Sequence, residues 1–129
     1  SSASPACSVH HPAEGMRLYD GVKYGYKVRG ELIGWCLFFK REMLKITGKL
    51  DPKFTFWYAD NDYSMMLQKH GLIHALVTDS IVDHLESQTL NTKSEKERKK
   101  LTTREQFYYE YKWEGRSYFS YLNRLRKFK

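Results

Sequence analysis

The sequence has few cysteines and no long apolar run, and both absences narrow the class of protein. Two cysteines in 129 residues, Cys7 and Cys36, offer neither a disulfide framework nor metal-ligand spacing. We therefore expect a reducing, cytoplasmic setting, with Cys36 as a small core residue. No apolar stretch reaches the about 18 residues that a membrane span needs. Residues 1–5 lack the basic and apolar regions of a signal peptide, and without a starting Met they predict a processed end or a cut within a longer protein.

Several enzyme motifs are also missing. The chain has no Gly-rich phosphate loop and no GxSxG, HExxH or CxxC sequence. His10 and His11 are adjacent and would point apart on a helix or a strand, so we do not expect them to hold a metal together. A hydrophobic content of 41% and an aromatic content of 16% are instead typical of one globular domain with a core.

The net charge of +7 is unevenly distributed along the chain. Residues 1–92 carry 10 basic and 10 acidic side chains, whereas residues 93–129 carry 12 basic and 5 acidic ones. We therefore divide the chain into a domain at 1–92 and a basic, aromatic-rich helical tail at 93–129. A basic segment favours an anionic partner such as nucleic acid, phospholipid headgroups or a phosphorylated substrate, although a solvated helix has the same composition.

The first half predicts mainly loops and one buried strand. Residues 1–30 show little periodicity and predict loop, with a short strand near 24–28. The continuous apolar run at 31–39 predicts a buried strand, in which Gly34 would mark a close backbone approach. Helical spacing follows at 40–47.

The second half predicts a helix, a strand and two further helices. Residues 62–70 have helical spacing that Gly71 would end, and 72–77 predict a strand followed by a turn at 78–80. The order of strand, helix, acidic loop, helix and strand is typical of an α/β domain.

The tail predicts a charged hinge and two helices. Residues 91–101 form the hinge, and Thr102 with Glu105 has the spacing of a capping box that would start a helix to about Trp113. A final amphipathic helix at 118–128 has an apolar stripe with basic residues beside it. Such a helix can lie on a membrane surface or dock its stripe on its own domain.

Asp60 and Asp62 are the residues with the strongest chemical signal. They follow an aromatic cluster and stand at the start of a predicted helix. Acids at this place can cap the helix, bind a hard divalent cation, or act as a general base. Capping and catalysis are compatible, because Asp62 could cap while Asp60 faces a pocket.

Five segments, in order, resemble family 2 glycosyltransferases. The segment 34–42 is similar to the family's apolar run that ends in Arg-Glu, and 46–54 is similar to its Gly-rich element followed by Asp and Phe. The segment 58–63 resembles its Glu-Asp-x-Asp element. Residues 69–71 match the glycine that ends the next helix, and 82–84 resemble the His that closes the catalytic half. The resemblance covers roughly residues 30–90.

The resemblance implies an inverting, nucleotide-sugar-dependent transferase with the Rossmann-like glycosyltransferase fold A. Asp60 would be the base that deprotonates the acceptor hydroxyl, and Asp62 would orient the loop or cap the helix. His84 would lie near the diphosphate and its divalent metal, Mn or Mg. Gly34 and Trp35 would line the donor-sugar or acceptor pocket. The chemistry is coherent, because a sugar hydroxyl needs a base and a diphosphate leaving group needs positive charge.

The sequence departs from the family pattern in two respects. Ala59 stands where the family usually has Glu, and the family's N-terminal half, with its nucleotide-binding strands and metal-binding Asp-x-Asp, has no counterpart in this sequence. We therefore expect the chain to be the C-terminal, acceptor-binding half of such an enzyme, followed by C-terminal helices. Alone it is expected to be inactive and would need a nucleotide-binding half as partner.

Two alternative interpretations stay open for the tail and the acidic pair. The basic aromatic tail is also compatible with a non-enzymatic module that binds nucleic acid, and such binding would weaken steeply with salt. It could equally meet a membrane surface or a lipid-linked acceptor, which would place the protein at the periphery of the membrane. Asp60 and Asp62 could themselves be the metal-holding Asp-x-Asp.

Overall fold

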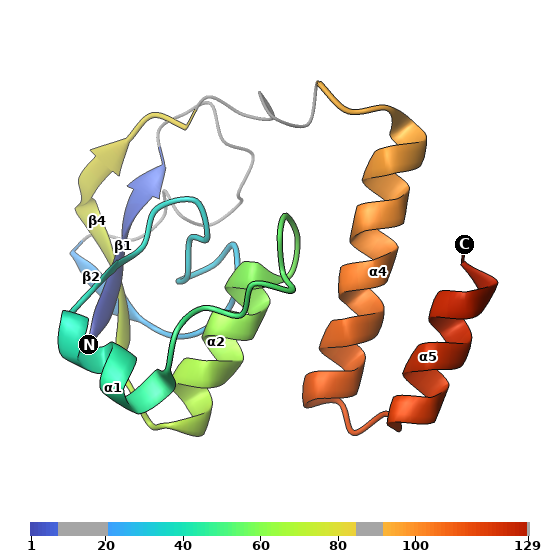
Figure 1. Cartoon of the computed structure of the whole chain (residues 1–129). Helices are drawn as coiled ribbons and strands as arrows, with labels where there is room; N and C mark the ends of the chain where they lie inside the picture. The colour runs from blue at the N-terminus through green and yellow to red at the C-terminus, as the bar shows by residue number, and fades with distance from the viewer. Residues whose placement is uncertain (8–20, 85–91, 129) are drawn as a thin grey trace. The chain divides into compact units, whose positions relative to one another are not determined.

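The computed structural model describes residues 1–7, 21–84 and 92–128. Over these residues the protein is of mixed α/β type, as predicted (Figure 1). The pair His10-His11 lies outside the described residues.

The chain forms two compact units, and each of them combines two separate stretches of sequence. The first unit contains residues 1–50 and 63–86, and the second contains 51–62 and 87–129. The segment 51–62, which carries the acidic pair, is therefore grouped with the basic tail.

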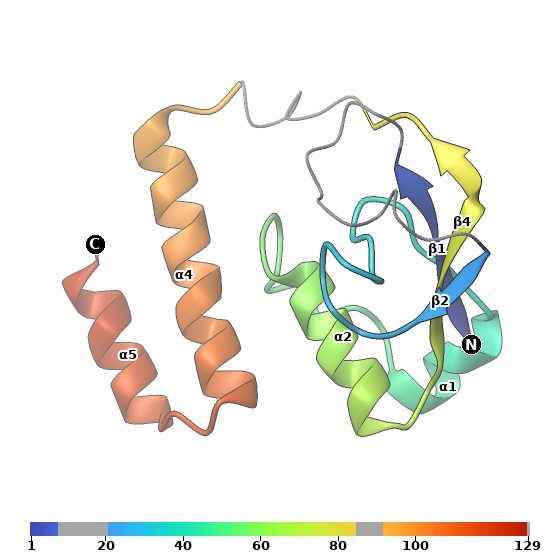
Figure 2. The same ribbon diagram turned by 180° about the vertical axis from the view of Figure 1, so that it is seen from behind.

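The first unit is built on a four-stranded mixed sheet of order β2-β4-β1-β3. Figure 2 labels β1, β2 and β4. The two central strands, β1 and β4, are parallel, and the short edge strands β2 and β3 are antiparallel to their neighbours. The strands are β1 (Ser2–Cys7), β2 (Val22–Tyr24), β3 (Phe38–Phe39) and β4 (His74–Val82).

The prediction of loop at the N-terminus is wrong for β1. Its sequence, SASPAC, contains no β-branched or aromatic residue, so it lacks the composition that identifies strands. Small side chains nevertheless suit a strand between two neighbours, and Ser4 and Ala6 are buried. Pro5, which cannot donate a ladder hydrogen bond, lies where the register with β4 shifts, a place where strands tolerate proline.

The predicted strand at 31–39 is also largely wrong, because only Phe38–Phe39 pairs in the sheet. Leu32 and Ile33 are buried in the core without belonging to a strand, so the apolar run reflects burial rather than extended structure. The predicted helix at 40–47 is present as a 3-10 turn, Arg41–Met43, and α1 (Leu44–Thr47).

The core of the first unit packs α2 (Ala59–Lys69) against the loops beside the sheet. Leu32, Met43, Tyr63 and Leu67 form a buried cluster. The helix ends, as predicted, before Gly71, whose φ of 60° favours glycine.

Strand β4 is longer than predicted, and the expected turn at 78–80 is part of it. Thr78 explains the difference, because its backbone N and its Oγ1 both donate to Gly21 O, at 2.9 and 2.6 Å. These bonds continue the pairing of β4 beside β2 beyond the apolar run.

The second unit contains α4 (Glu95–Trp113) and α5 (Tyr118–Lys127). The predicted hinge and the capping box at Thr102 are wrong, because α4 starts two turns earlier at a capping box formed by Ser94 and Glu97. Thr102 instead donates its hydroxyl to Arg98 O within the helix, at 2.9 Å.

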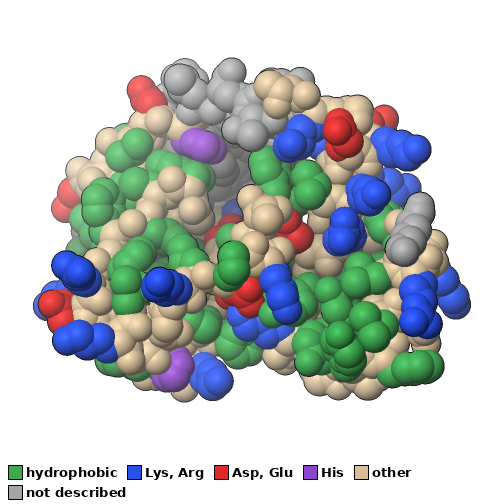
Figure 3. Space-filling model, in the orientation of Figure 1, with side chains coloured by type: hydrophobic (Ala, Val, Ile, Leu, Met, Phe, Trp, Pro, Cys, Tyr) green, Lys and Arg blue, Asp and Glu red, His purple; other side chains and the backbone are tan. Residues whose placement is uncertain are grey.

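The apolar stripe of α5 docks on α4, so that the two helices lie side by side as an antiparallel hairpin (Figure 1). Phe128 contacts Phe107 with ring centroids 6.0 Å apart, and Tyr121 stacks on Tyr111 at 5.4 Å. These contacts agree with the docking use of the stripe, here on the neighbouring helix α4, and the membrane-surface use stays a prediction. Lys and Arg side chains gather on the surface over α4 and α5 (Figure 3), while the anionic partner stays a prediction.

Among the residues that the structure describes, no helix is both long and apolar enough to cross a membrane.

A buried histidine joins the two central strands. His74 is 1% exposed, and its Nδ1 lies 2.6 Å from Ser2 Oγ while its Nε2 lies 3.3 Å from Ser4 Oγ. Ser4 Oγ also donates to Ile33 O, so it can accept from Nε2–H while Ser2 donates to Nδ1. Burial lowers the pKa of His74 below its usual value, despite an opposing effect of Glu31.

This burial predicts a loss of stability in mild acid. Because the pKa of His74 is lower in the folded state, its contribution is complete above the unfolded pKa of about 6.5 and is lost as the pH falls below it. Urea unfolding between pH 7.5 and 5.0 should therefore show a declining free energy of unfolding. His74→Gln should flatten this decline, and the exposed His70→Gln should keep it. An equal slope in wild type and His74→Gln would contradict the assignment.

Candidate functional site

The acidic pair lies in the first turn of α2, which starts earlier than predicted. The helix begins at Ala59, and a hydrogen bond of 2.8 Å from Asp62 N to Tyr58 O closes its first turn. Asp60 Oδ1 accepts from the backbone N of Asn61 at 2.9 Å. Both carboxylates are therefore well placed to interact favourably with the helix dipole.

Asp62 is buried and engaged by two residues near the end of α4. It is 2% exposed, and its Oδ1 lies 2.7 Å from Lys112 Nζ and 2.7 Å from Trp113 Nε1. Lys112 Nζ also contacts Asp51 Oδ2 at 2.9 Å, so that one ammonium bridges two carboxylates. Burial alone would lower the pKa of Lys112, but its hydrogen bonds with Asp62 and Asp51 outweigh this and raise it. Asp62 therefore joins the first turn of α2 to the end of α4.

Asp51 anchors the other end of the same segment. Its Oδ1 accepts from Lys53 N at 3.0 Å in the predicted turn, and its Oδ2 accepts from Tyr108 OH at 2.9 Å. Burial would raise the pKa of Asp51, but the bonds from Lys112, Lys53 and Tyr108 lower it overall. The segment 51–62 is thus fixed to α4 at both ends.

Between these ends, Glu105 holds the chain that leads into α2. Its side chain is buried, and its Oε1 accepts from Thr55 Oγ1 at 2.6 Å and from the backbone N of Thr55 and Phe56 at 3.0 and 3.1 Å. Its Oε2 accepts from Trp57 N at 2.6 Å. One carboxylate therefore satisfies three consecutive backbone amides.

Tyr58, directly after these amides, has a strained backbone. Its φ of 60° lies in the left-handed region, which is unfavourable for a bulky residue. Such strain costs of order 1–3 kcal/mol and persists where the surroundings fix the chain, often at functional sites. Its ring contacts Tyr109 of α4 with centroids 5.2 Å apart. The strained residue lies two positions before Asp60.

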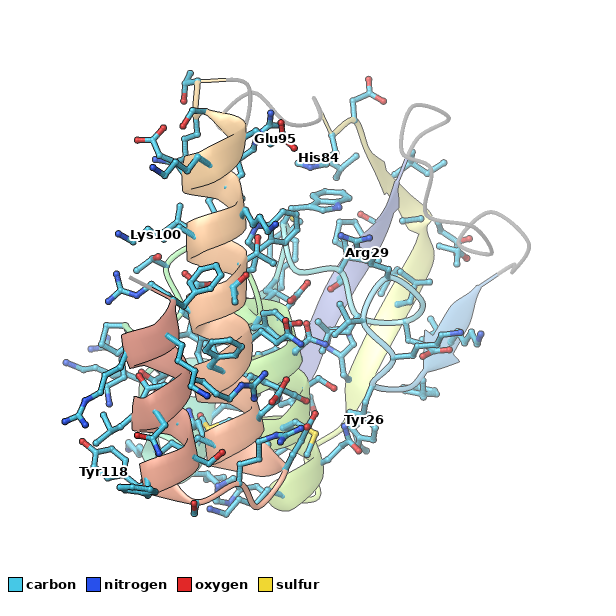
Figure 4. All side chains as sticks on the ribbon, turned by 90° about the vertical axis from the view of Figure 1, so that its right-hand side faces the viewer. Tyr26, Arg29, His84, Glu95, Lys100 and Tyr118 are labelled. Carbon is cyan, nitrogen blue, oxygen red and sulfur yellow. The ribbon has the colours of Figure 1, made fainter. Side chains whose placement is uncertain are left out.

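The remaining predicted site residues belong to the first unit. Trp35 and His84 are brought together, with ring centroids 4.6 Å apart and planes only 2° from parallel. Figure 4 labels His84 just beyond the end of β4. Gly34, next to Trp35, is exposed. Two residues to which the resemblance assigned site roles are therefore neighbours, although they are 49 positions apart in sequence.

The described residues do not gather a metal site. No group of three or more His, Cys, Asp or Glu side chains has suitable geometry in the parts of the chain that the structure covers. His84 offers one imidazole as a ligand, and its ring is stacked on the indole ring of Trp35. Asp62 is held by an ammonium and an indole N–H, which weakens the interpretation of Asp60 and Asp62 as a metal-holding pair.

Sequence analysis missed three residues of this arrangement, namely Glu105, Lys112 and Trp113. Their partners lie about 50 positions earlier, and local spacing carries no signal for such contacts. The Thr102–Glu105 spacing did single out Glu105, but assigned it to capping its own helix.

No protein-family model matches the chain, and comparisons with curated proteins and with solved structures also give no match.

The Lys112 bridge predicts a large effect on stability. Lys112→Met leaves the buried Asp62 carboxylate without its cation, which should lower the free energy of unfolding by about 3 kcal/mol. Urea unfolding would measure the loss, and Lys100→Met, at an exposed site on α4 (Figure 4), should stay within about 0.5 kcal/mol of wild type.

The double variant Asp62→Asn/Lys112→Met separates the ion pair from general packing. It should lose less stability than the sum of the two single variants, since they share one interaction. Strict additivity would show that the pair contributes no coupling.

Proposed function

We propose that this chain is the acceptor-binding half of an inverting glycosyltransferase and that Asp60 is its general base. The acceptor hydroxyl would transfer its proton to the Asp60 carboxylate while its oxygen bonds to the anomeric carbon of the donor sugar. The bond from that carbon to the diphosphate would break on the opposite side, releasing the nucleoside diphosphate with inversion. The resemblance to family 2 glycosyltransferases motivates the reaction class.

One observation carries the choice of Asp60, namely that the two acids of the pair differ in their surroundings. Asp62 is buried and its Oδ1 is occupied by Lys112 and Trp113. Asp60 is half-buried, and the described bond to its carboxylate comes from the adjacent amide of Asn61. A general base must keep lone pairs available for the proton that it accepts. This division supports Asp60 as base and Asp62 as its structural support.

For the first unit, we propose the fold and the pocket residues that the resemblance implies. The parallel central strands β1 and β4 are compatible with a Rossmann-like, fold A architecture, which we propose for the complete enzyme. Gly34 and Trp35 would line the donor-sugar or acceptor pocket. The stacked rings of Trp35 and His84 support a shared role for these two residues.

The described residues provide only part of a site for the divalent metal that the resemblance to family 2 glycosyltransferases implies. His84 offers one ligand, and the described residues do not bring two further ligands to it. We therefore place the metal-binding acids in the nucleotide-binding partner half, and no step above depends on a metal held by this chain alone.

The base assignment predicts a selective loss of turnover. In the complete enzyme, Asp60→Asn should lower kcat by at least about 100-fold, since general bases contribute about 10²–10⁴-fold, and should leave donor binding intact. Release of nucleoside diphosphate in the presence of acceptor measures turnover. Asp79→Asn, at an exposed site on β4, is the matched control and should retain activity. Turnover within about tenfold of wild type, or about 1.4 kcal/mol of barrier, would exclude Asp60 as base.

Calorimetry on the chain itself tests the competing metal-site interpretation. Because Lys112 occupies Asp62, the acidic pair should bind Mn²⁺ only weakly, with or without a nucleoside diphosphate. Asp60→Asn should leave this weak signal unchanged. Tight binding that Asp60→Asn abolishes would instead identify the pair as the metal site and would contradict the role of Asp60 as base.

A further inference from the structure

We infer that Glu105 is a positioning residue that sets the location of Asp60 by fixing the backbone of residues 55–57. This inference rests on the proposed function for its catalytic meaning, whereas the fixation itself can be tested without any substrate. It makes α4 part of the element that presents the base.

The carboxylate of Glu105 is saturated with hydrogen bonds. An ionised carboxylate has about four lone-pair sites, and Glu105 uses them for three backbone amides and one hydroxyl, at 2.6 to 3.1 Å. Bonds to a charged acceptor are roughly twice as strong as neutral ones. The carboxylate is also 4% exposed, so water does not compete for these donors. The backbone of Thr55, Phe56 and Trp57 is therefore held in one conformation.

The conformation of residues 55–57 is linked to the location of Asp60. Trp57 N is bound to Glu105, Tyr58 then takes its strained φ of 60°, and Tyr58 O accepts from Asp62 N to close the turn that contains Asp60. A strained residue keeps its conformation only where its neighbours are fixed on both sides. Glu105 fixes the side before Tyr58, and the Lys112–Asp62 pair fixes the side after it. The start of α2, and with it Asp60, depends on both.

Contact with residues 55–57 is not common to all buried carboxylates on α4. Glu110 lies on the same helix and is similarly buried, at 7% exposure, but its carboxylate contacts Arg116, Arg124 and Gln106. It stabilises the α4–α5 hairpin and makes no described contact with residues 55–57. Glu110 is therefore a matched control for Glu105.

Amide hydrogen exchange on the full chain tests the fixation. Glu105→Gln places an NH₂ group against the donors of 55–57, so the amides of Phe56, Trp57 and Asp62 should exchange at least about tenfold faster, or about 1.4 kcal/mol less protected. Glu110→Gln should leave these three amides unchanged and affect α5. Unchanged exchange at Phe56 and Trp57 would overturn the fixation. Faster exchange there with an unchanged Asp62 amide would overturn the link to Asp60.

A milder and a rescuing variant cover the case in which Glu105→Gln does not fold. Thr55→Val removes only the hydroxyl bond of 2.6 Å and should accelerate the same amides to a smaller degree. Tyr58→Gly, which relieves the left-handed strain, should restore part of the protection of Asp62 in the Thr55→Val background. Thr55→Val without any effect on these amides would count against the inference.

Kinetics of the complete enzyme tests the positioning role. Glu105→Gln should lower kcat at least tenfold with the KM for the donor unchanged, whereas Glu110→Gln should keep both within about threefold. Equal losses in the two variants would show a purely structural role and overturn the inference. The proposed function fails separately, if Asp60→Asn retains turnover while the amide results for Glu105→Gln stand.

Discussion

The segment that presents the acidic pair depends on acceptors for its own backbone amides. An unsatisfied buried amide costs about 1–3 kcal/mol. Residues 55–57 lie just before α2, so hydrogen bonds within the helix do not satisfy their amides. Glu105 supplies the acceptors from a helix about 50 positions further along the chain. The basic tail therefore completes the structure of the acidic segment, which explains why residues 51–62 group with α4 and α5 rather than with the sheet.

Features set by local physics could be predicted from the sequence. The ends of α1 and α2 and the break after α4 fall before Gly48, Gly71 and Gly115, and all three have a positive φ that glycine adopts without strain. The amphipathic period of α5 likewise identified both the helix and its docking face. These signals lie within a few residues of the feature that they determine.

Features set by distant partners could not be predicted. Strand β1 is a strand because β4 and β3 pair with it, and its small residues carry no strand propensity of their own. The capping-box spacing at Thr102 does not start a helix, because α4 already begins after Ser94 and Glu105 binds residues 55–57 instead of the backbone of Thr102. The different surroundings of Asp60 and Asp62 depend in the same way on Lys112, a residue that local spacing does not connect to them.

The function that we propose requires one acid of the pair to act as base while the other stays bound within the protein. Two free carboxylates in one helical turn would compete for the acceptor proton and would attract a cation between them. Lys112 and Trp113 remove Asp62 from that competition, because they occupy its Oδ1 at 2.7 Å each. Ala59 stands where the element that 58–63 resembles usually has Glu, so in the proposed mechanism one further competing acid is absent. In the proposed mechanism, α4 therefore leaves Asp60 as the one available proton acceptor of the pair, and Lys112 is the cation that engages the other acid.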